Sequence, residues 1–472
     1  MWRIGIAALI LAGCQAERAA QTPSEPVFGP LKSVDDGIPI ELSAVWKSRG
    51  YGWIFDARGP ELRQYQVAGD TCFLTPLDMP VMTDALALSY DYFRLSDDPD
   101  RAILQLLPED TEIHVDRIPD LPEPCTNSAD PSYDSVFRYF SSVVRENYAF
   151  LERRNIDWDA RVAEAREQLP FVSNDEEFFE LLARMIDGFS DSHTKLLAEV
   201  NGETRRQQDG LGETLEIVRA QEIETPWLIQ IFMGALDDWL DPGAEFTAND
   251  RILWGTIDEG RVGYIQILQM GGFSGVEIDD PSFRQAEFDV FDGVMDKALS
   301  AMTDAEYVIL DLSNNRGGYD AISRRVAGLF TDERVAGYTT EVPGTGIPPR
   351  TRWVEPAEGT RYTGPVILLT SDVTVSGGEL ATLSLRELPN VTHVGETTRG
   401  SFSTVLSKPL PNGWLVELAN EVIAAPDGTV YEESGIEPEH VHDVFRPDQI
   451  MESHKLTIDW ILAHEGELIG SE

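Results

Sequence analysis

Ser376 stands in the sequence Thr-Val-Ser-Gly-Gly-Glu, where a hydroxyl group is followed by two glycines. An apolar run at 366–370 precedes it and residues 377–388 have a helical pattern, so Ser376 should lie between a buried strand and a helix. The free amides of a helix N-terminus can stabilise a developing oxyanion, and glycine allows a substrate carbonyl to come close. Ser376 is therefore a candidate nucleophile for acyl transfer. The simpler alternative is that Ser376 caps the helix and Glu379 completes a capping box.

A second glycine-rich turn, Asp-Leu-Ser-Asn-Asn-Arg-Gly-Gly at residues 311–318, also follows an apolar strand pattern. Its glycines, Gly317 and Gly318, have backbone amides, and either one could bind an oxyanion together with the amide of Gly377. The alternative is a tight turn without a chemical role.

A serine nucleophile needs a proton acceptor, and the pair Ser192-His193 offers one. Imidazole has an unperturbed pKa of roughly 6.5, so His193 could accept the serine proton at neutral pH. The chain has seven histidines, so this pair gains weight only if the fold brings it to the serine.

Several segments would have to position these residues. Residues 31–128 show short alternating apolar runs broken by Gly, Pro and Asp, which predicts a small β-rich domain. Residues 131–196 carry apolar side chains at three- and four-residue spacing, which predicts helices. Residues 197–260 mix strand-like and loop segments, with Trp227–Ile231 as an expected strand. Over 261–445 apolar strands alternate with amphipathic helices, which is typical of an α/β unit.

Six segments, in this order, resemble the tail-specific or C-terminal-processing serine proteases, and within them the tricorn-like branch. The resemblance covers about residues 132–445, and its segments are Ile156-Asp157-Trp158 with Asp191-Ser192-His193-Thr194, then Val262-Gly263-Tyr264-Ile265, Asp311 to Gly318, Thr374 to Glu379, Gly395 to Gly400 and Tyr431 to Glu439. It implies an α/β protease core with a crotonase-like ββα organisation, preceded by a helical segment and a small β-rich N-terminal domain.

With this resemblance, the expected organisation has seven parts. They are a lipoprotein signal peptide over 1–13, a tether over 14–30, the β-rich domain over 31–128, a helical segment over 131–196 that ends in the Ser-His motif, a connecting segment over 197–260, the serine protease core over 261–445 and a C-terminal helix over 446–472.

The resemblance implies that Ser376 is the nucleophile and that the glycine amides named above form the oxyanion hole. Two residues depart from the family's pattern near that hole, because Arg316 replaces a small residue and Ser313 replaces an arginine. One branch of the family uses a serine–lysine dyad. Ser401 occupies the position of that lysine here, and the nearest downstream lysine, Lys408, does not align with that position.

The other branch uses a histidine, the serine beside it and a glutamate near the C-terminus. This chain has all three, so the resemblance implies His193 as general base, oriented by Glu432 through Ser192. Glu433 is the alternative acid, because it is adjacent and the register could slip. Residues 197–260 lack a Gly-Leu-Gly-Phe-like carboxylate-binding loop, so a full PDZ domain and specificity for substrate C-termini are not expected.

The charge balance excludes several classes of function. The 472 residues include 82 acidic and 37 basic side chains, which gives a formal net charge of −45. A phosphate-binding face needs clustered cations, so nucleic-acid binding is not expected, and the acidic surface would be repelled by anionic lipids. It would attract basic peptides. His440 and His442 are too few for a zinc site, so neither a metal nor another cofactor is expected.

The N-terminal residues 1–14 read MWRIGIAALILAGC, with Arg3 ahead of a short apolar core and a lipobox-like end. This pattern predicts a lipoprotein signal peptide that is cleaved before Cys14, whose sulfur would carry lipid. The expected location is the bacterial cell envelope, anchored by that lipid, in the outer membrane and facing the periplasm or the surface. A simple secretory signal with a chance cysteine is the alternative.

The two remaining cysteines, Cys72 and Cys125, form an even pair, which predicts a disulfide in an oxidising compartment. Two buried free thiols are the alternative.

These patterns favour a serine peptidase that acts on peptides or proteins through a Ser376 acyl-enzyme. A non-catalytic ligand- or peptide-binding relative on the same fold and a serine hydrolase of non-peptide esters remain open. The sequence predicts no oligomeric state.

Overall fold

The computed structural model describes residues 29–30, 38–76, 92–105, 110–278, 280 and 282–470. The expected signal peptide and the lipidation site at Cys14 lie outside the described residues. Within these ranges, every helix is too short or too polar to cross a membrane.

An eight-stranded antiparallel sheet, the N-terminal sheet, begins the described chain. Its strand order is β1-β6-β7-β8-β2-β3-β4-β5. Its strands are β1 (Gly29–Pro30), β2 (Val45–Ser48), β3 (Trp53–Asp56), β4 (Arg63–Ala68), β5 (Thr71–Leu74), β6 (Tyr92–Leu95), β7 (Arg101–Gln105) and β8 (Glu112–Ile118), with the 3-10 helix η1 (Ile40–Leu42) before β2. The β-rich character expected near the N-terminus is therefore present.

A helical lobe follows, in which three helices pack on a four-stranded sheet. The helices are α2 (Tyr133–Asn147), α3 (Trp158–Gln168) and α4 (Asp175–Ile186), with the 3-10 helices η2 (Glu123–Thr126) and η3 (Leu169–Phe171). The sheet has the order β10-β9-β20-β19, and its strands are β9 (Lys195–Val200), β10 (Glu203–Gln208), β19 (Val405–Pro409) and β20 (Leu415–Ala419). Phe140 of α2, Leu182 of α4 and Val416 of β20 are among the fully buried side chains of the shared core. Chain segments about 200 residues apart therefore fold together here.

The core sheet has seven strands in the order β11-β12-β13-β14-β17-β18-β22, and β13 to β22 run parallel. Its strands are β11 (Glu245–Thr247), β12 (Ile252–Ile257), β13 (Val262–Ile267), β14 (Tyr307–Asp311), β17 (Val366–Thr370), β18 (Val391–Gly395) and β22 (His440–Val441). A smaller sheet beside it has the order β16-β15-β21 and contains β15 (Val335–Glu341), β16 (Arg350–Val354) and β21 (Val422–Ala424).

Helices cover both faces of the core sheet. One face packs on α7 (Phe283–Ala301), α8 (Asp320–Gly328) and α9 (Gly377–Arg386), and the other on α5 (Glu213–Ala220), α6 (Glu224–Gly234) and α10 (Ser453–Ala463). The remaining elements are the π-helix η4 (Ala235–Trp239), the 3-10 helix η5 (Pro447–Gln449) and α11 (Glu465–Leu468). The alternation of β14 explains this arrangement, because Leu310 faces the first helix layer and Ile309 the second.

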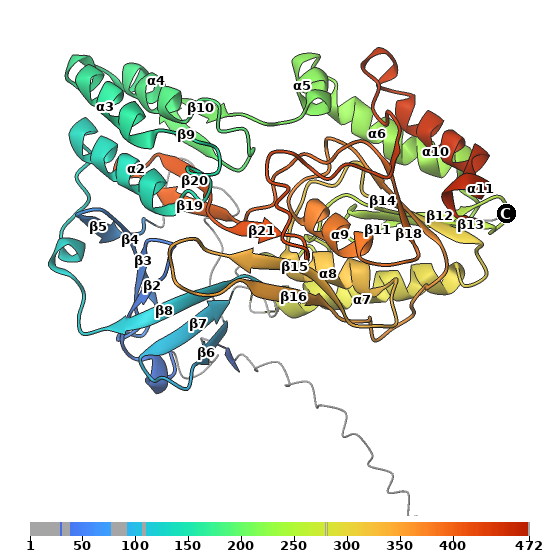
Figure 1. The fold of residues 1–472 in the computed structure, drawn as a ribbon, viewed down its shortest axis with the longest axis horizontal. Coiled ribbons are helices and arrows are strands. Elements are labelled where there is room, and N and C mark those ends of the chain that lie inside the picture. Colours follow the sequence, from blue (N-terminus) through green and yellow to red (C-terminus); the bar gives the residue numbers. More distant parts are fainter. Residues whose placement is uncertain are drawn as a thin grey trace, which may run out of the picture.

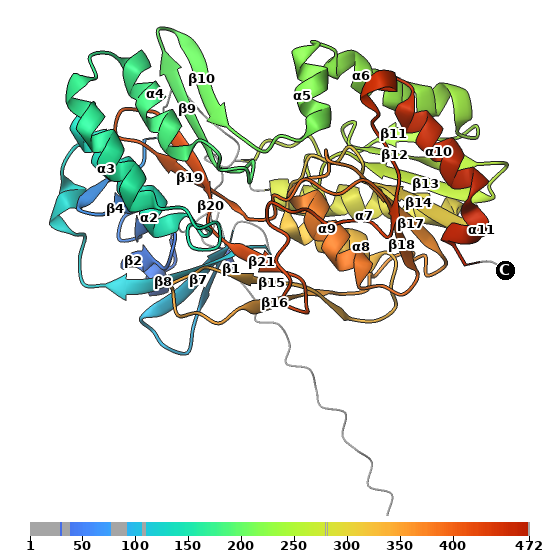
Figure 2. The same cartoon turned by 45° about the horizontal axis from the view of Figure 1, so that its top comes forward.

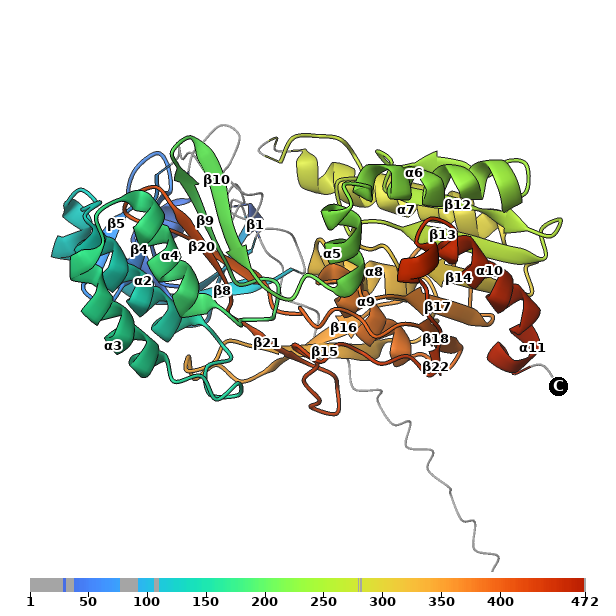
Figure 3. The same cartoon turned by 90° about the horizontal axis from the view of Figure 1, so that it is seen from above.

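The N-terminal sheet and the helical lobe occupy one end of the molecule, and the core sheet occupies the other (Figures 1 and 3). Helices α8 and α9 lie side by side against the core, as Figure 2 shows. Strand β19 follows β18 of the core sheet in the sequence and pairs with β20 in the sheet of the helical lobe, so the chain connects the two ends here.

One expected element is wrong. Residues Trp227–Ile231 belong to helix α6 and not to a strand. The segment is apolar on nearly every side, so its periodicity could not separate a buried helix from a strand. Trp227 and Ile231 are both buried, as i and i+4 positions of a helix allow, and Pro226 lies in the first turn, where its missing amide is tolerated.

Candidate active site

Ser376 lies in the turn between β17 and α9, beyond the carboxyl end of a parallel strand. Its φ of +55° lies in the left-handed region that residues with a side chain rarely adopt, so the turn is strained. Its amide lies 3.1 Å from the carbonyl of Ser401 and 3.1 Å from Oε2 of Glu379. The buried Glu379 carboxylate also accepts the amides of Gly400 (2.6 Å) and Ser401 (2.8 Å). Glu379 therefore does more than cap a helix, because it fixes the strained serine to a neighbouring loop.

Gly317 lies directly against Ser376. A Cβ on Gly317 would be 2.8 Å from Ser376 Cβ and 3.3 Å from its Oγ, so a side chain does not fit there. The Gly317 amide donates to Asn315 Oδ1 at 2.9 Å and is not available to a substrate. Among the described residues, the amides of Gly318 and Gly377 have no acceptor, and a Cβ on Gly377 would lie 3.0 Å from the Gly318 nitrogen. The geometry thus favours Gly318 over Gly317 as the partner of Gly377 in an oxyanion hole.

His193 lies in a tight turn after α4, and the buried carboxylate of Asp191 holds that turn. This carboxylate accepts the amides of His193 (3.0 Å) and Thr194 (2.6 Å) and the hydroxyl of Tyr148 (2.7 Å). Ser192 between them has a φ of +53°. The His193 ring is buried, and no described residue forms a hydrogen bond with its Nδ1. Asp191 was not expected as a site residue, although an Asp ahead of two amides that it caps is typical of an Asx-turn.

The Ser192 hydroxyl makes a contact that the sequence did not predict. It lies 2.6 Å from the hydroxyl of Ser401, which in turn donates to the carbonyl of Asp191. Both serines are buried. Ser192 therefore contacts Ser401 and not Glu432 in this structure. The position expected for a lysine in the dyad branch holds a hydroxyl that links the His193 turn to the Ser376 loop.

The structure places Glu432 and Glu433 in different surroundings. Glu432 is buried, and its Oε2 accepts the amides of Phe402 (3.0 Å) and Ser403 (3.1 Å), while its Oε1 has no hydrogen-bond partner within the described ranges. Glu433 is partly exposed and forms an ion pair with Arg154 at 2.7 Å. Glu432 is therefore the better candidate for a catalytic acid.

The loop Ser401–Ser403 is where the parts of the site meet. Ser401 accepts the amide of Ser376 and contacts the hydroxyl of Ser192. Phe402 and Ser403 donate their amides to Glu432, and the Ser403 backbone contacts the His193 ring. In the described part of the chain, no hydrogen bond joins His193 directly to Ser376. Catalytic contacts are often long in ligand-free enzymes and shorten when substrate binds.

Burial determines which protonation states these groups prefer. Burial first, and then the positive charges of Lys195 and Arg399, lower the pKa of His193 to about 3, so the imidazole is neutral at pH 7. Burial, followed by the negative charge of Asp191, raises the pKa of Glu432 well above its ordinary value, against the effect of its two amide partners. The resting site therefore contains a histidine in its proton-accepting form.

Ser376 opens onto a cavity of about 550 Å³. Two of the expected site residues, Ser376 and Gly318, line it, and the N-terminal region contributes Tyr51, Trp53 and Ile113 to the same lining. The β-rich N-terminal region, in which the sequence shows no motif, is thus part of the surroundings of Ser376.

Of the two departures from the family's pattern, Arg316 has a side-chain partner, whereas the Ser313 hydroxyl has none among the described residues. The Arg316 guanidinium extends to α6, where Nη1 lies 3.1 Å from Oε1 of Glu224. The Ser313 amide donates to Asp311 at 2.8 Å, and the same carboxylate lies 2.7 Å from Nε2 of His454 on α10. Both contacts fix the oxyanion turn to helices on one face of the core sheet.

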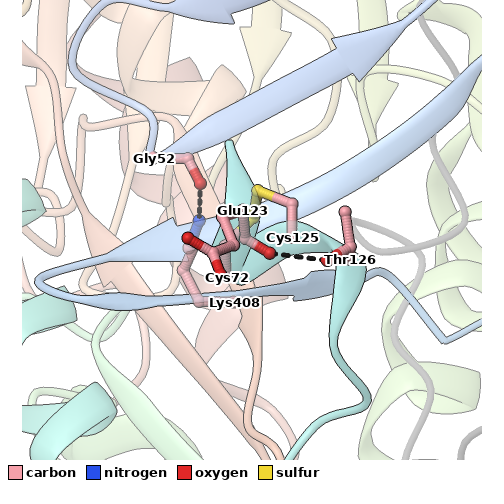
Figure 4. Close-up of a disulfide and its surroundings, with 6 residues drawn as sticks. All are labelled: Gly52, Cys72, Glu123, Cys125, Thr126 and Lys408. Carbon is pink, nitrogen blue, oxygen red and sulfur yellow. Dashed lines mark hydrogen bonds between the residues drawn. A yellow bond between two sulfur atoms is a disulfide. The ribbon is translucent and has the colours of Figure 1, made fainter. Parts of the chain in front are cut away.

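Lys408 is not part of this site. It is buried on β19, and its Nζ donates to the carbonyls of Tyr51 (3.1 Å) and Gly52 (2.6 Å), as Figure 4 shows for Gly52. A disulfide between Cys72 of β5 and Cys125 of η2 belongs to the same surroundings (Figure 4) and has a Cα–Cα distance of 4.5 Å. The lysine and the disulfide both hold the N-terminal sheet in place.

Comparison with known proteins covers the core and the helices. Residues 261–442 match peptidase family S41, and residues 130–187 match the C1 domain of tricorn protease. The chain is 28% identical over 170 residues to the carboxy-terminal processing protease CtpA of Bacillus subtilis (strain 168), which covers 34% of this chain and 35% of that protein. The match thus spans about a third of the length of this curated relative.

Two solved structures have a similar fold. A protein from Parabacteroides merdae ATCC 43184 has 22% identity and a TM-score of 0.54, over 71% of this chain and 98% of that one. Mature CPAF in complex with lactacystin has 13% identity and a TM-score of 0.52, over 72% of this chain and 99% of that one. Two family matches follow each other along the chain in the same order as the histidine turn and the serine turn, and together they support a tail-specific or tricorn-like protease family for this chain.

Proposed function

We propose that the chain is a serine peptidase that cleaves peptide bonds through an acyl-enzyme on Ser376. One observation carries this proposal: a strained serine lies beside two backbone amides that have no acceptor among the described residues, at the wall of a cavity of about 550 Å³. Strain at a single residue is retained where the surrounding structure enforces it, which is common at active sites. A crotonase-like organisation of the core belongs to the same proposal, and the parallel strands β13, β14, β17 and β18 with their helices support it.

In the proposed reaction, Ser376 Oγ attacks the substrate carbonyl carbon while its proton passes to His193. The carbonyl oxygen becomes an oxyanion and receives the amides of Gly318 and Gly377. The intermediate then collapses, the C–N bond breaks, and the leaving amine takes the proton from His193. Water next attacks the acyl-enzyme with His193 again as the base, which releases the acid product and restores Ser376.

Glu432 has a defined part in this scheme. A proton on His193 creates a positive charge in a buried place, which stabilises the ionised form of a nearby carboxyl and so lowers the pKa of Glu432. The amides of Phe402 and Ser403 already hold one oxygen of that carboxylate. Glu432 would thereby stabilise the imidazolium, as the acid does in other serine hydrolases.

Labelling with a fluorophosphonate tests the proposal, since the probe reacts with activated serines. We expect the wild-type chain to be labelled and Ser376→Ala and His193→Ala to lose the label. Hydrolysis of quenched peptides is then compared with hydrolysis of simple esters. A folded wild-type chain without Ser376-dependent labelling would support the non-catalytic alternative, and labelling with turnover of esters alone would support the ester hydrolase.

We also propose that the chain is a lipoprotein of the bacterial outer membrane, held by lipid on Cys14 and facing the periplasm or the surface. The lipobox-like sequence before this cysteine supports it. The test is metabolic labelling with palmitate and membrane fractionation, in which Cys14→Ser should abolish the label. Unlabelled wild-type protein in the soluble fraction would contradict a lipid anchor.

A further inference from the structure

The cavity beside Ser376 has an uneven distribution of charge. Of the described residues that line it, Asp110, Asp320 and Glu277 are acidic and only Arg251 is basic. Asp110 precedes β8 of the N-terminal sheet, and Asp320 begins α8 immediately after the oxyanion turn. Asp110 therefore comes from the N-terminal sheet and Asp320 from the core, and each is 7% exposed.

The two aspartates are close enough to influence each other. Burial first, and the negative charge of Asp320 second, raise the pKa of Asp110 to about 7, although the guanidinium groups of Arg324 and Arg352 oppose this. Arg324 and Arg352 already have partners of their own, since Arg324 donates to the Tyr338 hydroxyl at 2.9 Å and Arg352 to the Asp110 carbonyl at 3.2 Å. The guanidinium groups therefore offset only part of the effect of burial and like charge, and a cation in the cavity would further stabilise the ionised forms of the two carboxyl groups.

A separate observation points in the same direction. Asn420 also lines the cavity and is 1% exposed, yet its Oδ1 has no hydrogen-bond partner in the part of the chain that the structure describes. Its Nδ2 faces the Gly50 carbonyl at 3.5 Å, so exchanging the amide oxygen and nitrogen would place two acceptors together. A buried acceptor without a donor is costly, and a ligand that supplies N–H groups would remove that cost.

A group that fits this cavity must be positively charged and rich in donors, with an apolar stem. Trp53, Phe402 and Leu406 line the same space and would pack on methylene groups. We propose that this cavity is a specificity pocket for a lysine or arginine side chain of the peptide substrate, with Asp110, Asp320 and Asn420 as its acceptors. This inference rests on the proposed peptidase function and narrows its substrates to peptides with a basic residue at one fixed position.

The pocket must be distinguished from the attraction of the whole surface, because a net charge of −45 favours any cationic peptide at low salt. Surface attraction acts over a Debye length and weakens with salt, whereas a buried pair is screened much less. Position along the peptide separates the two effects as well. Surface attraction depends on total charge, and a pocket depends on where the charge lies relative to the cleaved bond.

The test uses quenched peptides of equal length in which one position at a time carries arginine, citrulline, lysine or norleucine. Citrulline keeps the shape of arginine and lacks its charge. At one position we expect kcat/KM to be at least about tenfold higher for arginine than for citrulline, also in 0.5 M salt. Asp110→Asn and Asp320→Asn should each reduce that ratio. The exposed Asp97 of the same sheet is the matched control, and Asp97→Asn should leave the ratio unchanged.

Two results would overturn the pocket. The first is equal cleavage of arginine and citrulline peptides at every position by wild-type protein that a fluorophosphonate labels on Ser376. The second is a preference for arginine that survives both variants or disappears in salt. Because the wild-type series is decisive alone, a variant that does not fold leaves the test valid. Absence of labelling would instead contradict the peptidase function itself.

Discussion

Ser376 and the amides of Gly318 and Gly377 come from two adjacent strand ends of one sheet, whereas His193 reaches the site from the helical lobe at the other end of the fold. Strands β14 and β17 are paired in parallel, so the turns that follow them meet at the same edge of the core sheet. His193 follows the helical lobe, and its neighbour Ser192 meets Ser401 across 209 residues of sequence. We call Ser376 with the amides of Gly318 and Gly377 the serine half of the site, and it is local to one sheet. The base half, His193 with Ser192, depends on long-range packing.

This difference shows where the site is vulnerable. The serine half is built into a strand register that cannot shift without unfolding the core. The base half depends on the loop Ser401–Ser403 and on hydroxyl and amide contacts to it. Variants of the serine half should therefore abolish chemistry in a folded protein, and variants around the loop should have graded effects.

The largest effect is expected for Ser376→Ala. Removal of the nucleophile should lower kcat by about 10⁴-fold or more and abolish fluorophosphonate labelling. Ser384→Ala is the matched control, because Ser384 lies in α9 and its hydroxyl bonds only to the Leu380 carbonyl at 2.9 Å. Labelling of Ser376→Ala at the wild-type rate would assign the nucleophile to another residue.

His193→Gln should follow, with a loss of about 10²–10⁴-fold in kcat/KM, since that is the usual contribution of a general base. The matched control is His393→Gln, a histidine buried in β18 whose Nε2 lies 2.8 Å from Thr370 Oγ1. Peptide cleavage at substrate concentrations below KM measures both. An equal loss in the two variants would show that the effect is structural.

The next largest effect on kcat/KM is expected for Glu432, and it should exceed the effect for Glu433. Glu432→Gln should cost about 10²-fold in kcat/KM because the imidazolium loses its acid. Glu433→Gln removes an ion pair with Arg154 that is partly exposed, and such pairs contribute about 1 kcal/mol or less. A larger loss of kcat for Glu433→Gln than for Glu432→Gln would reverse the assignment of the acid.

Ser401→Ala tests the link between the two halves. The variant loses the contact with Ser192 and the bond to the Asp191 carbonyl, which together should cost about 1 kcal/mol, or roughly fivefold in the rate of labelling. The two readouts are the rate of fluorophosphonate labelling, measured by quenching the reaction at successive times, and the melting temperature. A fall in melting temperature with an unchanged labelling rate would restrict Ser401 to a structural role.

The smallest expected change is in pH dependence. Because the folded pKa of His193 is about 3, kcat/KM should stay nearly constant as the pH falls from 7 to 5. The unfolded chain has a histidine pKa of roughly 6.5, so below that pH the unfolded state binds a proton that the folded site excludes. The protein should therefore become less stable as the pH is lowered below that value. A decline of kcat/KM centred near pH 6.5 would mean that His193 is solvated in the working enzyme.

The serine half could be predicted from the sequence because its signals are local. A buried strand, a glycine-rich turn and a helix start determine where Ser376 and Gly318 lie, and the parallel pairing of their strands brings them together. The choice between Gly317 and Gly318 could not be predicted, because it depends on the Asn315 side chain that occupies one amide.

The base half could be predicted only through resemblance to a family. No spacing rule connects Ser192 to Ser401, and the roles of Glu432 and Glu433 differ only by which way each side chain is directed in the folded chain. Residues Trp227–Ile231 of α6 resemble a strand in the sequence because four of the five are apolar, and so short an apolar run does not show a helical period. The N-terminal sheet was expected, but its place beside Ser376 depends on packing between remote segments.

The order of the site residues along the chain has a consequence for biosynthesis. His193 is made early, Ser376 much later and Glu432 near the end of the core. At about 5–20 residues per second, a ribosome needs roughly 10–50 s to extend the chain from His193 to Glu432. During that interval the nascent polypeptide has a base but no complete set of partners for it. In the proposed mechanism, the nascent chain therefore stays inactive until Glu432 has been synthesised.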